Sequence, residues 1–162
     1  MNRKWPVSLR ALVLAVALLP AWSGCRRQQA PPSVTIAGKT WQVELAATAK
    51  ERYRGLAGRR SLSENAGVLF IFPEPEVLTF CMRGCLIPLD IAFISADHRV
   101  AAVHTMSVEP DLAGRESYCS GVPVQYALEV PAGALARAAV EAGQRVVFGG
   151  NIPQAAKEPP DP

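Results

Sequence analysis

Three cysteines carry most of the reactive chemistry that the sequence offers beyond its N-terminal region: Cys81, Cys85 and Cys119. Residues four apart on an extended strand lie about 13 Å apart, at roughly 3.3 Å per residue, whereas a disulfide needs Cα atoms within about 7 Å. Cys81 and Cys85 can therefore pair only if the chain turns between them, which Gly84 permits. Alternatively, Cys119 closes onto one of them and fixes a long loop to the fold. The odd number predicts one disulfide and one free thiol, or a metal site.

A soft-metal site is the alternative use of the same side chains. The thiols of Cys81, Cys85 and Cys119, the imidazole of His104 and the thioether of Met106 form a donor set that favours Cu(I). His104 and Met106 also have ordinary roles at the end of a strand. A catalytic thiol pair has less support, because Cys-x3-Cys differs from Cys-x2-Cys and no helix N-terminus follows to activate a thiol. We expect no cofactor, with copper as the alternative.

Several polar side chains are candidates for contact with a ligand. Asp90 lies inside an apolar run over residues 86–95, where a buried carboxylate needs a partner such as Arg59, Arg83 or a free backbone N–H group. Alternatively, Asp90 lies at the mouth of a cleft where these arginines bind an anion. Glu129 alternates with apolar neighbours and is expected to face solvent. The candidate ligand contacts are Arg59, Met82, Arg83, Asp90, Tyr118 and Ser120.

The N-terminal region has the pattern of an export signal. A basic stretch precedes an apolar run over residues 11–20, within the roughly 7–15 residues of a signal core and shorter than the about 20 residues of a spanning helix. The sequence Ser23-Gly24-Cys25 is similar to the lipobox of bacterial lipoproteins, although Trp22 stands where an aliphatic residue is usual. Lipidated Cys25 would hold the chain on a bacterial membrane, outside the cytoplasm. Ordinary cleavage near Gly24 is the alternative.

Composition predicts one folded domain between flexible ends. Residues 1–24 are the predicted lipoprotein-type signal peptide, 25–33 a flexible tether, 34–150 the globular domain and 151–162 a disordered Pro-rich tail. Three of the 17 basic residues lie in the leader, so the rest of the chain has 14 basic and 14 acidic side chains. This balance provides no basic field for nucleic acid. The expected partners are the membrane, through Cys25, and an unknown small molecule, peptide or envelope protein.

The elements that must position these residues are mostly short strands. Alternation around Gly38-Lys39 predicts a hairpin, Thr48 to Glu51 forms a capping box that begins a short helix, and the polar residues 107–122 predict a long loop. Further strands are predicted over residues 67–72, 77–82, 86–95, 100–104, 124–130 and 145–148, and a second helix over 133–139. The predicted fold class is α+β: a compact, mostly-β, partly closed small barrel with two short helices.

Four motifs in order resemble the domain-of-unknown-function 192 family. They are RGLAGR at 54–59, GVLFIFP at 67–73, FCMR at 80–83 leading into LIPLDI at 86–91, and YALEV at 126–130. The resemblance covers the whole domain and implies a compact β-rich barrel with small helices, often exported or lipid-anchored. It implies no reaction, because the family has no established activity. Cys81 and Cys85 depart from the family pattern, which has an aromatic residue and a threonine there. If the aromatic residue of the family lines a ligand groove, that groove is remodelled in this chain.

The motifs of common enzymes are absent from the sequence. It contains no nucleophile elbow with an ordered Ser-His-Asp set, no Walker loop and no zinc-protease helix. An enzyme is therefore less expected than a binding protein. The sequence predicts a membrane-anchored, extracytoplasmic binding or accessory domain with an unknown ligand. The alternative is a thiol-redox or copper-handling protein that uses Cys81, Cys85 and Cys119, and a hydrolase has the least support.

Overall fold

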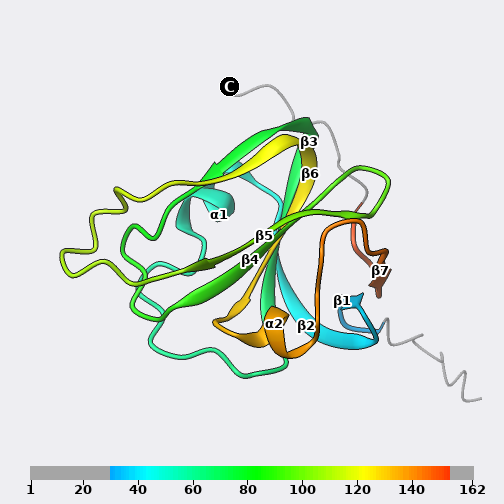
Figure 1. The fold of residues 1–162 in the computed structure, drawn as a ribbon, viewed down its shortest axis with the longest axis horizontal. Helices are drawn as coiled ribbons and strands as arrows, with labels where there is room; N and C mark the ends of the chain where they lie inside the picture. The colour runs from blue at the N-terminus through cyan, green and yellow to red at the C-terminus, as the bar shows by residue number, and fades with distance from the viewer. Residues whose placement is uncertain (1–29, 154–162) are drawn as a thin grey trace, which may run out of the picture.

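The structure is a computed structural model that describes residues 30–153. Within this range one curled sheet has the strand order β5-β4-β6-β3-β2-β1-β7 and carries two short helices (Figure 1). This architecture confirms the predicted partly closed barrel. The strands are β1 (Ser33–Ile36), β2 (Lys39–Ala46), β3 (Ala66–Phe80), β4 (Leu89–Ile94), β5 (Val100–Met106), β6 (Tyr118–Pro131) and β7 (Val146–Gly149), and the helices are α1 (Ala49–Arg54) and α2 (Ala134–Arg137).

Several sequence-based predictions fall wholly or largely outside this range. The signal peptide, Cys25, most of the tether and most of the Pro-rich tail belong to residues 1–29 and 154–162, which the structure does not describe. Between residues 30 and 153, no helix has the length and apolar character needed to cross a membrane.

The first hairpin and the first helix form as predicted. β1 pairs with β2 in antiparallel register, and Ala37 (φ 49°) and Gly38 (φ 79°) between them are both left-handed, as a tight hairpin turn requires. Thr48 Oγ1 accepts a hydrogen bond from Glu51 N at 3.3 Å, and Glu51 Oε2 accepts one from Thr48 N at 3.0 Å. A threonine N-cap contributes about 1 kcal/mol, so local chemistry decides where α1 begins.

β3 is one long strand where the sequence predicts two. It pairs in parallel with β2 and antiparallel with β6, with two register shifts between Ile71 and Thr79. These irregularities let the strand continue through Pro73, which cannot donate to a regular ladder. Because β6 begins at Tyr118 to pair with the end of β3, residues 118–122 lie in a strand and not in the predicted long loop.

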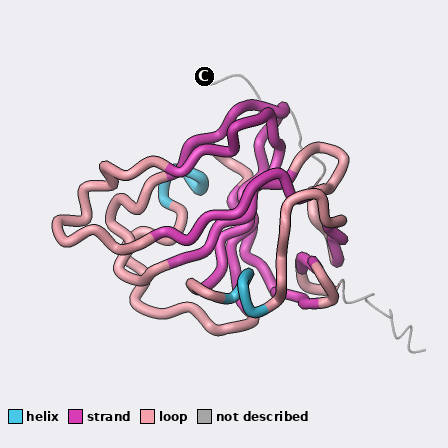
Figure 2. The backbone as a smooth tube through the Cα atoms, in the orientation of Figure 1, coloured by secondary structure: helices cyan, strands magenta, loops and turns pink. Residues whose placement is uncertain are grey.

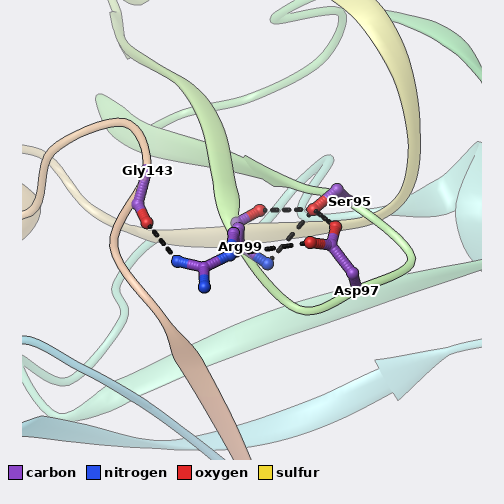
Figure 3. Close-up of polar contacts among 4 residues, drawn as sticks. All are labelled: Ser95, Asp97, Arg99 and Gly143. Carbon is purple, nitrogen blue, oxygen red and sulfur yellow. Dashed lines mark hydrogen bonds and ion pairs between the residues drawn. The ribbon is translucent and has the colours of Figure 1, made fainter.

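The two ends of the sheet meet at a polar seam. Arg99, just before β5, forms an isolated antiparallel bridge with Arg145, just before β7. Ser95 Oγ accepts from Arg99 N at 3.1 Å and lies 2.5 Å from Asp97 Oδ1, while Arg99 Nη1 donates to Gly143 O at 3.0 Å (Figure 3). These contacts join the turns at both sheet ends and partly close the barrel.

Apolar side chains are buried on both faces of the sheet. The barrel core has members from all seven strands and α2, with Trp41 as its largest fully buried side chain. The outer core lies on the opposite face of β3, β4 and β6 and includes Leu56, Met82 and Cys85 from the segments that cover it. The loops that contain these covering residues lie with α1 at one side of the sheet (Figure 2). Every residue of β4 is buried as a result.

Candidate functional site

A cavity of about 240 Å³ opens between α1, the end of β3 and the turn over residues 81–85. This volume is somewhat below the roughly 300–1,000 Å³ of sites for drug-sized ligands, so it suits a small organic molecule. The buried residues of its floor are Leu56, Phe70, Cys85 and Glu129. The half-buried Arg52, Phe72 and Phe80 form walls, and the exposed residues at the mouth are Tyr53, Arg54, Ala57, Thr79, Cys81 and Arg83.

Glu129 lies at the floor of this cavity, and the prediction that it faces solvent is wrong. The residue is 5% exposed. Its neighbours in the sheet are Val68 of β3 and Ile91 of β4, and the outer core covers the outer face of both strands. Alternate side chains of β6 therefore point into the barrel core and toward the outer core, and both faces of the strand are buried. No hydrogen bond or ion pair joins the Glu129 carboxyl group to any residue in the described range.

The buried position changes the protonation of this carboxyl group. Burial raises the pKa of Glu129 to about 8, because an apolar environment disfavours the charged form. At pH 7 the group is therefore mostly a neutral carboxylic acid, which both donates and accepts hydrogen bonds.

Three phenylalanine rings supply the aromatic lining. The rings of Phe70 and Phe80 meet edge to face, with centroids 4.9 Å apart and planes at 88°, and Phe72 lies 6.3 Å from Phe80. Phe80 also contacts Phe93 of β4 at 5.7 Å. Such pairs add about 0.5–1.5 kcal/mol beyond burial, and these contacts tie the lining rings to the outer core.

Two arginines are held against aromatic rings of the lining. The Arg52 guanidinium lies 5.0 Å from the centroid of the Phe72 ring and donates to two backbone carbonyl groups, including that of Ile71 at 3.0 Å. The Arg83 guanidinium lies 4.1 Å from the centroid of the Tyr53 ring and donates to Tyr53 O at 3.4 Å. Stacking of this kind restricts the position of the guanidinium groups.

The charges of the lining are unbalanced at neutral pH. Arg54 joins Arg52 and Arg83, so three guanidinium groups line a cavity whose one carboxyl group, that of Glu129, is mostly neutral. A positively charged, partly enclosed surface concentrates anions. The mouth of the cavity therefore favours a negatively charged group.

Cys81 and Cys85 line the same cavity from the two ends of a tight turn. Cys85 N donates to Met82 O at 3.0 Å, and Gly84 has a left-handed φ of 67°. The turn that a disulfide between these cysteines requires is therefore present. The side chains are nevertheless free thiols, one exposed and one buried.

Cys119 is also a free thiol, so the predicted disulfide is absent. The residue lies within β6, opposite Thr79 of β3, and its Sγ accepts from Gly121 N at 3.4 Å. Strand pairing already fixes this segment to the sheet. The physical reason for the wrong prediction is that Cys119 belongs to a strand and not to a loop that needs closing.

The thiol of Cys85 is expected to react much more slowly than those of Cys81 and Cys119. Burial raises the pKa of Cys85 to about 11 from an ordinary value of 9.0, which lowers its thiolate fraction about a hundredfold. Iodoacetamide at pH 7.5 should modify Cys81 and Cys119 first and leave Cys85 protected until the chain is denatured. Peptide mapping by mass spectrometry measures this order. Equal rates for Cys81 and Cys85 would contradict the buried position of Cys85.

The proposed soft-metal ligands do not converge. Among residues 30–153, no group of three or more His, Cys, Asp and Glu side chains is arranged to hold a metal ion. His104 Nε2 is 3.0 Å from Cys119 O, and Met106 is fully buried in the outer core. The copper alternative therefore has no assembled donor set to support it.

Of the predicted ligand contacts, Arg83 lines the cavity, whereas Arg59 and Met82 do not. Arg59 forms a bidentate pair with Glu44, at 2.6 and 2.7 Å, beside a neighbouring polar hollow. This pairing lowers the pKa of Glu44. Met82 is fully buried in the outer core, so its role is in packing and not in ligand contact.

Asp90 has a structural position and not one at the cleft. It is 1% exposed, its Oδ1 accepts from Thr105 Oγ1 at 2.8 Å, and its Oδ2 accepts from Leu135 N at 3.0 Å. The partners are thus a hydroxyl group of β5 and the backbone of α2, instead of Arg59 or Arg83. Asp90 joins α2 to the sheet.

Tyr118 and Ser120 are also bonded within the fold. Ser120 Oγ accepts from Leu78 N at 3.0 Å and donates to Val122 O at 2.7 Å. Tyr118 is mostly buried, and its hydroxyl group accepts from Ser107 N at 3.3 Å. Ser120 therefore stabilises the irregular pairing of β3 with β6, and Tyr118 joins β6 to the segment after β5. Neither residue lines the cavity.

Sequence analysis did not identify Glu129 or the aromatic lining as candidate site residues. A signal was present in the run YALEV. Leu128 and Val130 on one face of the strand and Ala127 on the face of Glu129 are all apolar. A strand with two apolar faces has no polar face for a glutamate. Such a glutamate is therefore a candidate for a buried site.

The fold and the cavity define a class of small, curled-sheet domains with a ligand-sized hollow beside a short helix. The sequence profile of the domain-of-unknown-function 192 family (DUF192, "Uncharacterized ACR") matches residues 32–148. The chain belongs to this family, which confirms the resemblance of its motifs.

Two solved structures share this fold. One, from Sinorhizobium meliloti 1021, is described as a proposed transcription regulator; it is 31% identical, with a TM-score of 0.66, and the match covers 74% of this chain and 95% of that one. The other, from Novosphingobium aromaticivorans DSM 12444, is a protein of unknown function; it is 30% identical, with a TM-score of 0.66 and coverage of 85% and 99%. No curated protein matches the chain.

Proposed function

We propose that this chain is a membrane-anchored, extracytoplasmic binding domain whose ligand enters the cavity beside α1. One observation carries the proposal: Glu129, a residue 5% exposed, lines a cavity with aromatic walls, and its carboxyl group has no hydrogen-bond partner among the described residues. Burying a polar group without a hydrogen bond is unfavourable. A bound molecule that forms a hydrogen bond with Glu129 would supply the partner that the described protein residues do not.

A small molecule fits this cavity better than the other expected ligands. Its volume of about 240 Å³ holds one compact organic molecule, whereas a protein partner needs a broad surface. The description of the Sinorhizobium relative as a transcription regulator would imply nucleic acid. The balance of 14 acidic and 14 basic side chains outside the leader does not favour that partner here.

The location rests on the sequence of the leader. The basic stretch, the apolar run over residues 11–20 and Cys25 after Ser23-Gly24 support export followed by lipidation. The full chain expressed in a bacterium should fractionate with the membranes, and the Cys25→Ser variant should lose the added acyl mass. If the masses of the wild type and the variant differed only by the substituted residue, the proposed lipid anchor would be contradicted.

The binding function is tested by blocking the cavity. A fragment library containing acids, bases and neutral compounds is screened against the full chain in detergent micelles, with thermal shift as the first readout and NMR as the second. Fragments should bind the wild type and the Thr40→Trp variant, which changes an exposed position of β2. They should not bind the Thr79→Trp variant, because Thr79 lines the cavity. Equal binding to both variants would contradict this site.

A thiol-redox function is the second candidate, and the turn between Cys81 and Cys85 favours it. Oxidised glutathione would convert the two thiols into an intramolecular disulfide and be reduced to two molecules of glutathione. The chain would lose the mass of two hydrogen atoms. A mixed disulfide with glutathione on Cys81, without transfer to Cys85, would exclude this function.

A further inference from the structure

We propose that the cavity selects a small organic anion that has an apolar body and a separate hydrogen-bond acceptor, with the anionic group at Arg83 and Arg54 and the acceptor at Glu129. This inference rests on the proposed binding function and names its ligand class.

The mouth of the cavity determines the charge of the ligand. Arg54 and Arg83 are both exposed there, and the stacking of Arg83 on Tyr53 at 4.1 Å holds its guanidinium group in place. A planar guanidinium group binds carboxylate and phosphate oxygens through two parallel hydrogen bonds. No acidic side chain is part of the lining at the mouth. Glu44 and Glu51 interact electrostatically with Arg54 from the neighbouring hollow, so Arg83 is the main contact for an incoming anion.

The walls determine the shape of the ligand. The rings of Phe70, Phe72 and Phe80 are packed edge to face, and the hydrophobic side chain of Leu56 completes the apolar surface of the floor. These groups offer contact area and no hydrogen bonds. The part of the ligand between its two polar ends is therefore apolar. A flat ring in this part would fit between the walls of the cavity.

The floor determines the second polar group. Glu129 is mostly protonated at neutral pH and donates through its hydroxyl group, so a carbonyl or ether oxygen is its matching partner. An ammonium group would also satisfy a carboxylate. However, it would have to enter past the guanidinium groups of Arg52, Arg54 and Arg83. The positive mouth therefore favours an anion with a deep acceptor over a cation.

Three para-substituted benzenes of similar size separate these features. 4-Acetylbenzoate has the anion and the acceptor, 4-ethylbenzoate has the anion alone, and 4-acetylbenzylamine has the acceptor with a positive charge. NMR titration of the full chain in detergent micelles should show 4-acetylbenzoate binding about tenfold more tightly than either analogue, since one hydrogen bond corresponds to about that factor. Its shift perturbations should centre on the cavity residues.

Matched variants assign each contact. Glu129→Leu should weaken 4-acetylbenzoate about tenfold and leave 4-ethylbenzoate unchanged, whereas Glu129→Gln keeps a donor and should restore most of the affinity. Arg83→Gln should weaken both benzoates about threefold, as expected for an exposed ion pair. Arg145→Gln, at the distant seam, is the control and should have no effect.

The pH dependence gives an independent readout. Because Glu129 donates only when protonated, affinity for 4-acetylbenzoate should fall as the pH rises through about 8, and the Glu129→Gln variant should show no such fall. Burial holds the pKa of the neighbouring Cys85 higher, at about 11, and β3 and β4 present only apolar residues beside Glu129. The remaining ionisable groups of the lining are Arg52, Tyr53, Arg54, Cys81 and Arg83.

The outcomes separate the two proposals. Tighter binding of 4-acetylbenzylamine, or equal binding of all three probes in the cavity, would overturn the ligand class and leave the binding function intact. Failure of these probes and of every fragment of the library to bind the cavity would overturn both.

Discussion

Raising the pH from 5 to 8 is expected to lower the free energy of unfolding of the wild-type chain by about 3 kcal/mol more than that of the Glu129→Gln variant. The folded-state pKa of Glu129 is raised to about 8 from 4.5, so between these values the folded chain binds a proton that the unfolded chain has lost. Stability contributed by this proton is complete below pH 4.5 and is lost as the pH rises through 8. Urea denaturation at a series of pH values measures it.

A second glutamate provides the control for this measurement. Hydrogen bonds from the backbone N–H groups of Arg115 and Glu116 lower the pKa of the half-buried Glu109, so this carboxyl group titrates below pH 5. Glu109→Gln should therefore leave the slope between pH 5 and 8 unchanged. Parallel curves for the wild type and Glu129→Gln would show that the Glu129 carboxyl group has a partner or is hydrated. Both proposals would then lose their main support.

Replacing Asp90 with alanine is expected to lower the free energy of unfolding by about 3 kcal/mol, because a buried backbone N–H group and a hydroxyl group lose their charged acceptor. These donors are Thr105 Oγ1 and Leu135 N, at 2.8 and 3.0 Å from the carboxylate oxygens. The first turn of α2 would also lose its connection to β4. Urea denaturation at pH 7 measures the change, and Asp90→Asn, which keeps one acceptor, should lose less.

Asp97 in the exposed turn before β5 is the control for Asp90. It interacts with Ser95 and Arg99 at the seam, and Asp97→Ala should lower stability far less than Asp90→Ala. Because Asp90 lies outside the cavity lining, Asp90→Asn should bind 4-acetylbenzoate as the wild type does. A loss of binding with unchanged stability would instead place Asp90 in the ligand site, as one alternative of the sequence analysis had it.

Local chemistry was sufficient to predict most of the elements. The capping box at Thr48 and Glu51, the hairpin after β1 and the apolar run at the start of β3 depend on residues within a few positions of each other. The class of fold followed from these short strands, and the motifs placed the chain in its family. Arg83 was predicted from the sequence as a candidate ligand contact, and it lines the cavity.

Tertiary structure alone decided that Glu129 lines the cavity and that Tyr118 and Ser120 do not. Glu129 is buried because segments more than 40 residues away in the sequence cover the outer face of β6, and alternation within one strand carries no information about a second cover. Tyr118 and Ser120 lie in a strand because β3 extends past Pro73 through irregular pairing, which no local pattern encodes. The sequence was therefore enough for the elements and the family, whereas the site depends on long-range packing.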